Sequence, residues 1–148
     1  MSKIRICADS TCDLSPELIE KYNITITPLQ IFLGDKDYTD QVDIFPQMIY
    51  DYVSKTGVLP KTAAVSVGTY TDVFTELKKE CDEIIHFTIS AEMSSCCQNA
   101  KIAAEEIDGV FVVDSRNLST GIGQLVIEAA IMAQDETKTG QEIVDYVS

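Results

Sequence analysis

The sequence predicts an α/β fold, a mostly parallel sheet with helices on both faces joined by β-α-β crossovers. Short β-branched, apolar segments alternate along the chain with segments whose apolar residues recur at helical spacing. Short loops separate them, and strands that alternate with helices in this way pair in parallel through right-handed crossovers. With 148 residues, of which 45% are hydrophobic, the chain is long enough for one domain with a sizeable core.

The first strand is expected at residues 3–9, which are apolar in the middle. The run Ser15-Pro16-Glu17 then predicts the start of a helix, because it offers a capping hydroxyl, a proline at the first helical position and an acid in the first turn. Residues 24–33 predict a strand that Pro28 interrupts. Since proline has no N–H to donate, this strand is expected at a sheet edge or at a bulge.

The middle of the chain predicts a return strand and a helix. After a turn at Gly34-Asp35, residues 36–39 are expected to form a short strand. Residues 46–55 predict a helix that Gly57 ends. Residues 60–66 are expected to form a loop or a short strand before the next helix.

The second half predicts further strand and helix pairs. Ser66 is a suitable cap for a helix through about residue 81, and a buried strand is expected at residues 83–89. The remaining elements, in order, are a helix at 93–107, a strand at 110–114 and a helix that begins at Ser119 or Thr120 and ends near 134.

A capping box lies near the end of the sequence. Thr139 is followed three residues later by Glu142, which predicts a helix start near residue 140. The sequence stops at Ser148, only a few residues into this helix. We therefore expect residues 1–148 to form one amino-terminal α/β domain, truncated just after the start of that helix.

The formal net charge of -13 bears on the partners of the protein. A surface this acidic repels phosphate backbones and anionic lipid head groups, which disfavours nucleic-acid binding and membrane docking. No apolar run is long enough to cross a bilayer, and the first ten residues lack the apolar core of a signal peptide. We therefore expect a cytoplasmic protein with no nucleic-acid partner and no membrane insertion.

The cysteines and the histidine predict packing roles. The five cysteines are odd in number and include no C-x-x-C pair, so they indicate a reducing compartment rather than disulfides or a zinc site. His86, the only histidine, lies in the expected strand at 83–89 and is predicted to be a packed core residue. Without a free histidine, no Ser-His-Asp or Cys-His pair is available. We expect no catalytic residue, no metal ligand and no cofactor.

Hydroxyl-bearing residues gather where the predicted strands end or helices begin. In open α/β sheets, ligands bind beyond the carboxyl ends of the strands. Hydroxyls and free N–H groups at helix starts suit an oxyanion, and the single cation among these segments, Arg116, fits a carboxylate better than a phosphate. Helix capping alone explains the same hydroxyls, so both interpretations stay open. The segments are residues 9–13, 62–66, 90–95 and 114–121.

Three carboxylates support an alternative function. Asp9 and Asp13 are close in sequence, and Asp114 is expected at the same sheet edge. Carboxylates placed together hold Mg²⁺ or share a proton, whereas capping and loop hydrogen bonds explain them without any site. The alternative is a metal-dependent hydrolase or phosphotransferase that uses these three residues. A third interpretation is a domain that serves only for protein–protein contact.

Several segments together resemble the DegV family of fatty-acid-binding proteins. Residues 62–66 fall where that family has Thr-Ser-Gln-Pro-Ser, and residues 89–100 where it has Ile-Ser-Ser-x-Leu-Ser-Gly-Thr-Tyr-Gln-Ser-Ala. The order and spacing of the matching segments over residues 4–133 make the resemblance specific. The other matching segments are residues 6–15, 24–29, 38–40, 113–115 and 121–123.

The resemblance implies that the chain binds a long-chain fatty acid, whose carboxylate a partner kinase subunit phosphorylates. It also implies that Thr62 and Ser94 hydrogen-bond the carboxylate. The chain would then be a lipid carrier or a substrate-presenting subunit rather than an enzyme. Other hydroxyls are expected to support this site: Ser10, Thr11, Ser66, Ser95 and Ser115.

The sequence departs from the family pattern at both proposed binding segments. Residues 63–65 are Ala-Ala-Val in place of polar residues and proline, and residues 95–97 are Ser-Cys-Cys in place of Gly-Thr-Tyr. The loss of glycine at position 95 restricts the close approach of the backbone to a ligand head group. The resemblance implies a second, lipid-enclosing domain, which we expect this sequence to lack. Because each buried methylene is worth roughly 0.8 kcal/mol, we expect this chain to keep the head-group half-site but to bind long acyl chains weakly.

Overall fold

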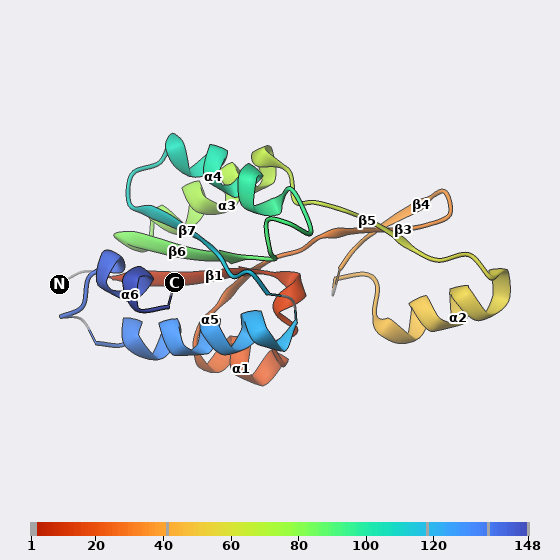
Figure 1. The fold of residues 1–148 in the computed structure, drawn as a ribbon, viewed down its shortest axis with the longest axis horizontal. Coiled ribbons are helices and arrows are strands. Elements are labelled where there is room, and N and C mark those ends of the chain that lie inside the picture. The colour runs from red at the N-terminus through yellow and green to blue at the C-terminus, as the bar shows by residue number, and fades with distance from the viewer. Residues whose placement is uncertain (1–2, 41, 118, 136, 148) are drawn as a thin grey trace.

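A four-stranded parallel sheet lies at the centre of the structure, a computed structural model that describes residues 3–40, 42–117, 119–135 and 137–147. The strand order is β2-β1-β6-β7 (Figure 1). The predicted α/β fold with a mostly parallel sheet is therefore confirmed. The strands are β1 (Ile4–Asp9), β2 (Thr25–Thr27), β6 (Glu83–Thr88) and β7 (Val110–Asp114).

A few positions named in the sequence predictions lie outside the described residues. Leu118 belongs to the hydroxyl-rich segment 114–121, and Ser148 is the last residue of the predicted domain. Residues 1, 2, 41 and 136 of that domain are also outside the described part.

Helices cover both faces of the parallel sheet, as predicted (Figure 1). α3 (Val67–Lys78) and α4 (Cys96–Glu105) pack together on one face, and α1 (Pro16–Lys21) and α5 (Thr120–Ala133) lie on the other. α6 (Gly140–Val147) packs against α5, β6 and β7. No helix in the described part of the chain has the length and apolar character needed to cross a bilayer. The main core includes the fully buried side chains Phe74, Ile84, Phe87 and Val126.

Three helix starts that were predicted from capping residues are confirmed. Ser15 at α1 and Ser66 at α3 each accept, through Oγ, the backbone N–H three residues further on, at 3.3 and 3.2 Å. At α6, Thr139 and Glu142 form the capping box, in which each side chain accepts the other residue's N–H at 3.2 Å. These bonds satisfy N–H groups that have no partner within the first helical turn.

The strand predicted at residues 24–33 is in fact two strands in different sheets. β2 ends at Thr27 on the edge of the parallel sheet, and β3 (Gln30–Leu33) pairs antiparallel with β4 (Lys36–Thr39) and β5 (Lys61–Ala63). The chain leaves the parallel sheet between them because Pro28 has no N–H to donate to a ladder. The edge position of β2 and the return strand β4 are confirmed, whereas the single continuous strand is wrong.

The antiparallel sheet and α2 (Pro46–Thr56) form a small lobe that projects from the main body, at the right of Figure 1. Its own core is the buried trio Ile31, Leu33 and Ile44, separate from the main core. α2 ends at Gly57, which adopts φ 70° as the predicted stop. β5 leads from this lobe back to α3 and carries Thr62.

Helix α4 begins later than predicted, at Cys96 instead of residue 93. Ser94 Oγ accepts the N–H of Cys96 at 3.2 Å, so the hydroxyl satisfies a donor at the helix start that the helix itself leaves free. Residues 89–95 therefore form a loop between β6 and α4. This loop places Ser94 at the amino end of α4.

Gly123 lies where α5 packs closely against the turn after β1. A Cβ at Gly123 would lie 2.8 Å from the backbone oxygen of Cys12, whereas one at Gly121 would meet only side-chain atoms of Asn117 among its three nearest neighbours. A side chain moves aside more easily than backbone. We therefore expect Gly123→Ala to lower the free energy of unfolding by about 1–3 kcal/mol, and Gly121→Ala by less. Urea unfolding of both variants checks this, and equal losses would show that the contact with Cys12 is not the cause.

Candidate functional site

The carboxyl ends of three parallel strands bring together three of the four predicted hydroxyl segments, residues 9–13, 90–95 and 114–121. β1 continues into a short 3₁₀ turn (Ser10–Cys12), β6 into the loop 89–95, and β7 into the turn that starts at Ser115. The Ser90 N–H donates to the Asn117 carbonyl at 3.1 Å, and Ser119 Oγ donates to Asp13 Oδ2 at 2.7 Å. These bonds join the loops into one connected edge, as expected for parallel strands.

Ser94 lies at the start of a helix, with its hydroxyl bonded to the first residue of that helix. It is partly exposed at the amino end of α4, where its Oγ accepts the Cys96 N–H and donates to Cys96 Sγ at 3.3 Å. A helix start also has free N–H groups and the positive end of the helix dipole. The next residue, Ser95, is exposed, and its side chain makes no capping hydrogen bond within the described chain.

Thr62 lies in a different position from the one predicted. It is an exposed residue of β5, paired with Ile31 in the antiparallel sheet, rather than a residue beyond the edge of the parallel sheet. The chain turn at Pro28, which creates this second sheet, is the reason for the difference. The segment that follows Thr62 is nevertheless joined to α4, because Asn99 Nδ2 donates to the Val65 carbonyl at 2.9 Å.

Three of the predicted supporting hydroxyls have structural partners. Ser10 Oγ donates to Asp40 Oδ2 at 2.6 Å and accepts the Leu29 N–H at 3.2 Å, which ties the end of β1 to the start of the small lobe. Ser66 caps α3, and Ser115 Oγ donates to the Thr88 carbonyl at 2.6 Å. Thr11 differs from these, since its buried Oγ1 has no hydrogen-bond partner among the described residues.

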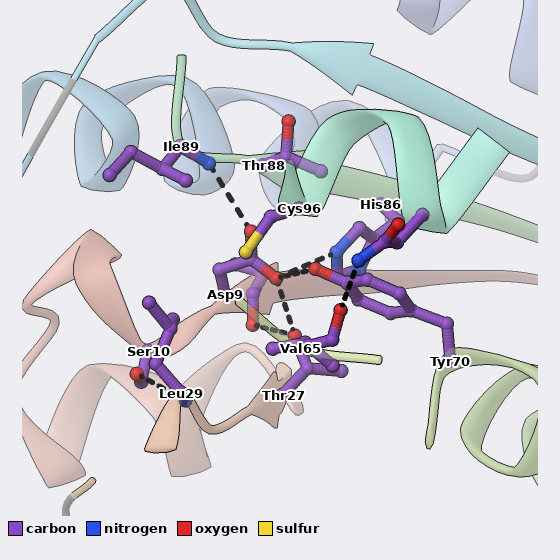
Figure 2. Close-up of polar contacts among 12 residues, drawn as sticks. Asp9, Ser10, Thr27, Leu29, Val65, Tyr70, His86, Thr88, Ile89 and Cys96 are labelled. Atoms are coloured by element: carbon purple, nitrogen blue, oxygen red, sulfur yellow. Dashed lines mark hydrogen bonds and ion pairs between the residues drawn. The ribbon is translucent and has the colours of Figure 1, made fainter. Parts of the chain in front are cut away.

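A buried polar network at the end of β1 was not anticipated from the sequence. Asp9 Oδ1 accepts hydrogen bonds from Tyr70 Oη at 2.6 Å and Thr27 Oγ1 at 2.7 Å, and contacts His86 Nε2 at 3.1 Å (Figure 2). Asp9 Oδ2 accepts the N–H of Ile89 at 3.2 Å. The side chains of Asp9, Thr27, Tyr70 and His86 belong to residues with 0% exposure, so water does not compete for these bonds.

The donors around Asp9 keep it ionised. Burial raises the pKa of this carboxyl, but the hydrogen bond and the electrostatic attraction of His86, together with the hydrogen bonds of Tyr70 and Thr27, lower the pKa below its ordinary value of 3.8. Burial raises the pKa of Tyr70 far above its usual range, so Tyr70 stays a proton donor. Nδ1 of His86 is buried without a partner among the described residues, whereas Nε2 of the same ring faces Asp9 Oδ1.

His86 itself is a packed core residue, as predicted. Its ring lies edge-on to Tyr70 at 5.1 Å and to Phe74 at 5.4 Å between ring centroids. The predicted packing role of the cysteines is also confirmed, because four are buried and Cys81 is partly buried. Burial raises the pKa of Cys12 to about 11, which keeps that thiol protonated and unreactive.

Acid is expected to remove the contribution of Asp9 to stability. Because the pKa of folded Asp9 lies below 3.8, its stabilising contribution is present above that value and is lost as the pH falls through the folded pKa. The unfolding free energies of the unaltered chain and of Asp9→Asn should therefore differ at neutral pH and converge as the pH falls below about 4. Urea titrations at a series of pH values check this; a difference that stays constant into acid would contradict an ionised Asp9.

The three carboxylates of the alternative function do not form a shared site. Asp9 is enclosed by its own donors, Asp13 is bonded to Ser119, and Asp114 Oδ1 accepts the N–H groups of Ala91 at 3.1 Å and Arg116 at 3.0 Å. The described residues contain no group of three or more His, Cys, Asp or Glu side chains placed to hold a metal ion. These contacts are the loop hydrogen bonds that were weighed against a metal site.

Only strand order could have revealed the network around Asp9. β1 pairs with β6, with Cys7 opposite His86, although residues 9 and 86 lie 77 positions apart in the chain. Tyr70 arrives from α3, 61 positions from Asp9. The one local signal was an aspartate at the end of an apolar strand. An ordinary loop aspartate that follows a strand gives the same signal.

Comparisons with known proteins agree with this fold. Residues 3–148 match the family described as uncharacterised protein, DegV family. A DegV domain-containing protein from Clostridium perfringens is 36% identical over 132 residues, which are 88% of this chain and 47% of that protein. A fatty-acid-binding DegV family protein from Thermus thermophilus aligns with TM-score 0.91 and 29% identity, over 99% of this chain and 52% of that one. A stearic acid-binding protein from Eubacterium ventriosum aligns with TM-score 0.83 and 29% identity, over 99% of this chain and 52% of that one. The chain thus spans about half the length of these relatives.

Proposed function

We propose that this chain, which belongs to the DegV family, binds a long-chain fatty acid by its carboxylate. Thr62 and Ser94 are the proposed hydrogen-bond donors to the two carboxylate oxygens. The relatives from Thermus thermophilus and Eubacterium ventriosum, which bind fatty acids, share the fold of this chain over nearly its whole length. No cofactor is part of the proposal.

The observation that carries the proposal is the position of Ser94. Its partly exposed hydroxyl lies at the amino end of α4, where free N–H groups and the helix dipole favour one negative charge. The Val65–Asn99 hydrogen bond links the segment that follows Thr62 to the same helix. A carboxylate needs less positive charge than a phosphate, which suits an edge whose exposed cation is Arg116.

Exposed apolar side chains accompany both proposed donors along the chain. Leu59, three residues before Thr62, is 74% exposed, and Met93, adjacent to Ser94, is 62% exposed. Large apolar side chains left in water favour an apolar ligand that would cover them. This supports a carboxylate that carries an acyl tail over a small polar acid.

We further propose that the chain presents the carboxylate to a partner kinase. In that reaction a carboxylate oxygen would attack the γ-phosphorus of ATP, the bond to the β-phosphate oxygen would break, and acyl phosphate and ADP would form. The presenting chain needs no base for this step, which suits a site whose neighbouring His86 is buried and bonded to Asp9. A kinase subunit and ATP, added to the chain with bound fatty acid, should give a hydroxylamine-sensitive product; no product with a kinase active on another DegV protein would count against presentation.

The proposed binding is tested by an NMR titration with decanoate and with decanol, which share a tail and differ in the head group. We expect decanoate to bind more tightly and to shift amide signals of residues 62–66 and 94–99. Mass spectrometry of molecules released by denaturing the purified chain, against an unrelated protein of similar charge, identifies any fatty acid that is carried along. Equal binding of decanol, or shifts confined to other regions, would contradict carboxylate recognition at Thr62 and Ser94.

A further inference from the structure

We propose that Asp9 is a positioning residue for the carboxylate site, which acts by holding the loop that carries Ser94. This inference rests on the proposed function, since it concerns the same site. Asp9 itself is fully buried and does not touch a ligand at the surface. It acts through the backbone N–H of Ile89, the first residue after β6, which it binds with Oδ2 at 3.2 Å.

The two oxygens of Asp9 have separate tasks. Oδ1 faces the three side-chain donors Thr27, Tyr70 and His86, whereas Oδ2 is bonded to the Ile89 N–H (Figure 2). The three donors fix the orientation of the carboxylate within the core. The second oxygen then sets where the loop 89–95 leaves the sheet.

The loop has a second anchor of a different kind. Asp114 Oδ1 accepts the Ala91 N–H at 3.1 Å and is partly exposed, so water can replace it. The anchor at Ile89 is buried, and an N–H that loses its partner there stays unsatisfied. Asp9 is therefore the stronger restraint on the path from β6 to Ser94.

Asp9 is also bonded to the helix that follows the other proposed binding segment. Tyr70, which donates to Asp9 at 2.6 Å, lies in α3 within its first turns, and Ser66 at the end of the 62–66 segment caps that helix. One buried carboxylate thus holds the loop before Ser94 and the helix after Thr62. Both proposed donors are positioned relative to a single buried group.

The substitution Asp9→Asn should break only one of these contacts. If the amide oxygen stays toward the three side-chain donors, the amide nitrogen takes the place of Oδ2 and faces the Ile89 N–H, so two donors oppose each other. The reverse orientation would set the nitrogen against three donors and is worse. Asp114→Asn is the matched control, because one oxygen of Asp114 accepts both of its N–H donors and the amide oxygen keeps both. Both substitutions remove one negative charge from a residue that anchors the same loop, but only Asp9→Asn is expected to lose a bond to the loop backbone.

The experiment combines hydrogen exchange with the decanoate and decanol titrations, on the unaltered chain and both variants. In Asp9→Asn we expect faster amide exchange at residues 89–96 and a fall of roughly tenfold in the preference for decanoate, as if one charged hydrogen bond were weakened. In Asp114→Asn we expect the amide exchange at residues 89–96 and the preference for decanoate to stay close to those of the unaltered chain. A merely structural role would weaken both ligands equally and would leave the preference unchanged.

Two results would overturn the positioning role. One is unchanged exchange and unchanged preference in a folded Asp9→Asn chain, and the other is an equal effect of the two variants. If Asp9→Asn does not fold, Tyr70→Phe replaces it, and we then expect partial loss of the same preference. A chain that binds decanoate and decanol equally before any substitution would instead contradict the proposed function and, with it, this role. The hydrogen-exchange data alone still show whether Asp9 holds the loop. Failure of the proposed carboxylate binding can therefore be told apart from failure of the positioning role.

Discussion

The double substitution Thr62→Ala and Ser94→Ala is expected to weaken decanoate binding by about 100-fold or more, because each hydroxyl would lose a hydrogen bond to a charged group worth about 1.5–3 kcal/mol. Decanol should lose much less, since its neutral head group forms weaker hydrogen bonds. NMR titration of both ligands against the double variant and each single variant measures the effect. Comparable losses for the two ligands would mean that the hydroxyls shape the surface without recognising the charge.

Controls separate recognition from folding in this experiment. Ser94 accepts the Cys96 N–H, so its removal is expected to cost about 1 kcal/mol of stability through the lost cap. Ser15→Ala removes a hydroxyl that accepts an N–H at the start of α1 and should cause a similar loss of stability without changing the preference for decanoate. Thr62→Ser keeps a hydroxyl on β5 and should restore most of the binding that Thr62→Ala loses.

Asp9→Ala is expected to cause the largest loss of stability, about 3–5 kcal/mol, because it leaves buried donors without their acceptor. Thr27, Tyr70, His86 and the Ile89 N–H all lose the same partner at once. Urea unfolding monitored by circular dichroism gives the difference in free energy. A total stability of 5–15 kcal/mol is typical of such domains, so the variant would lie near the limit of folding at room temperature.

The control for this prediction is Asp37→Ala, which removes a carboxylate from the exposed strand β4. A surface change of this kind should alter the free energy of unfolding by less than about 0.5 kcal/mol. Asp9→Asn should lie between the two, since its amide oxygen still serves three donors. A loss in Asp9→Ala no larger than in Asp37→Ala would show that the buried network contributes little to stability.

Much of the fold was predictable because its signals are local. The capping hydroxyls Ser15, Ser66 and Thr139, the stop at Gly57 and the edge strand before Pro28 all act within one turn of helix or one strand, and the structure confirms each. The alternation of strands and helices was enough to predict the parallel sheet. The hydroxyls of the loops after β1, β6 and β7 also followed from the sequence, because parallel strands end at one edge.

The sequence by itself therefore determined the fold class, most of the elements, the caps of α1, α3 and α6, and the residue types at the sheet edge. Tertiary structure alone decided which residues meet: Asp9 with His86 and Tyr70, Thr62 on a second sheet, and three aspartates with separate partners. The physical reason is that caps and turns depend on hydrogen bonds between neighbours in the chain. The pairing of β1 with β6 and the contact of Tyr70 with Asp9 instead depend on packing between residues more than 60 positions apart, and no local pattern in the sequence records that packing.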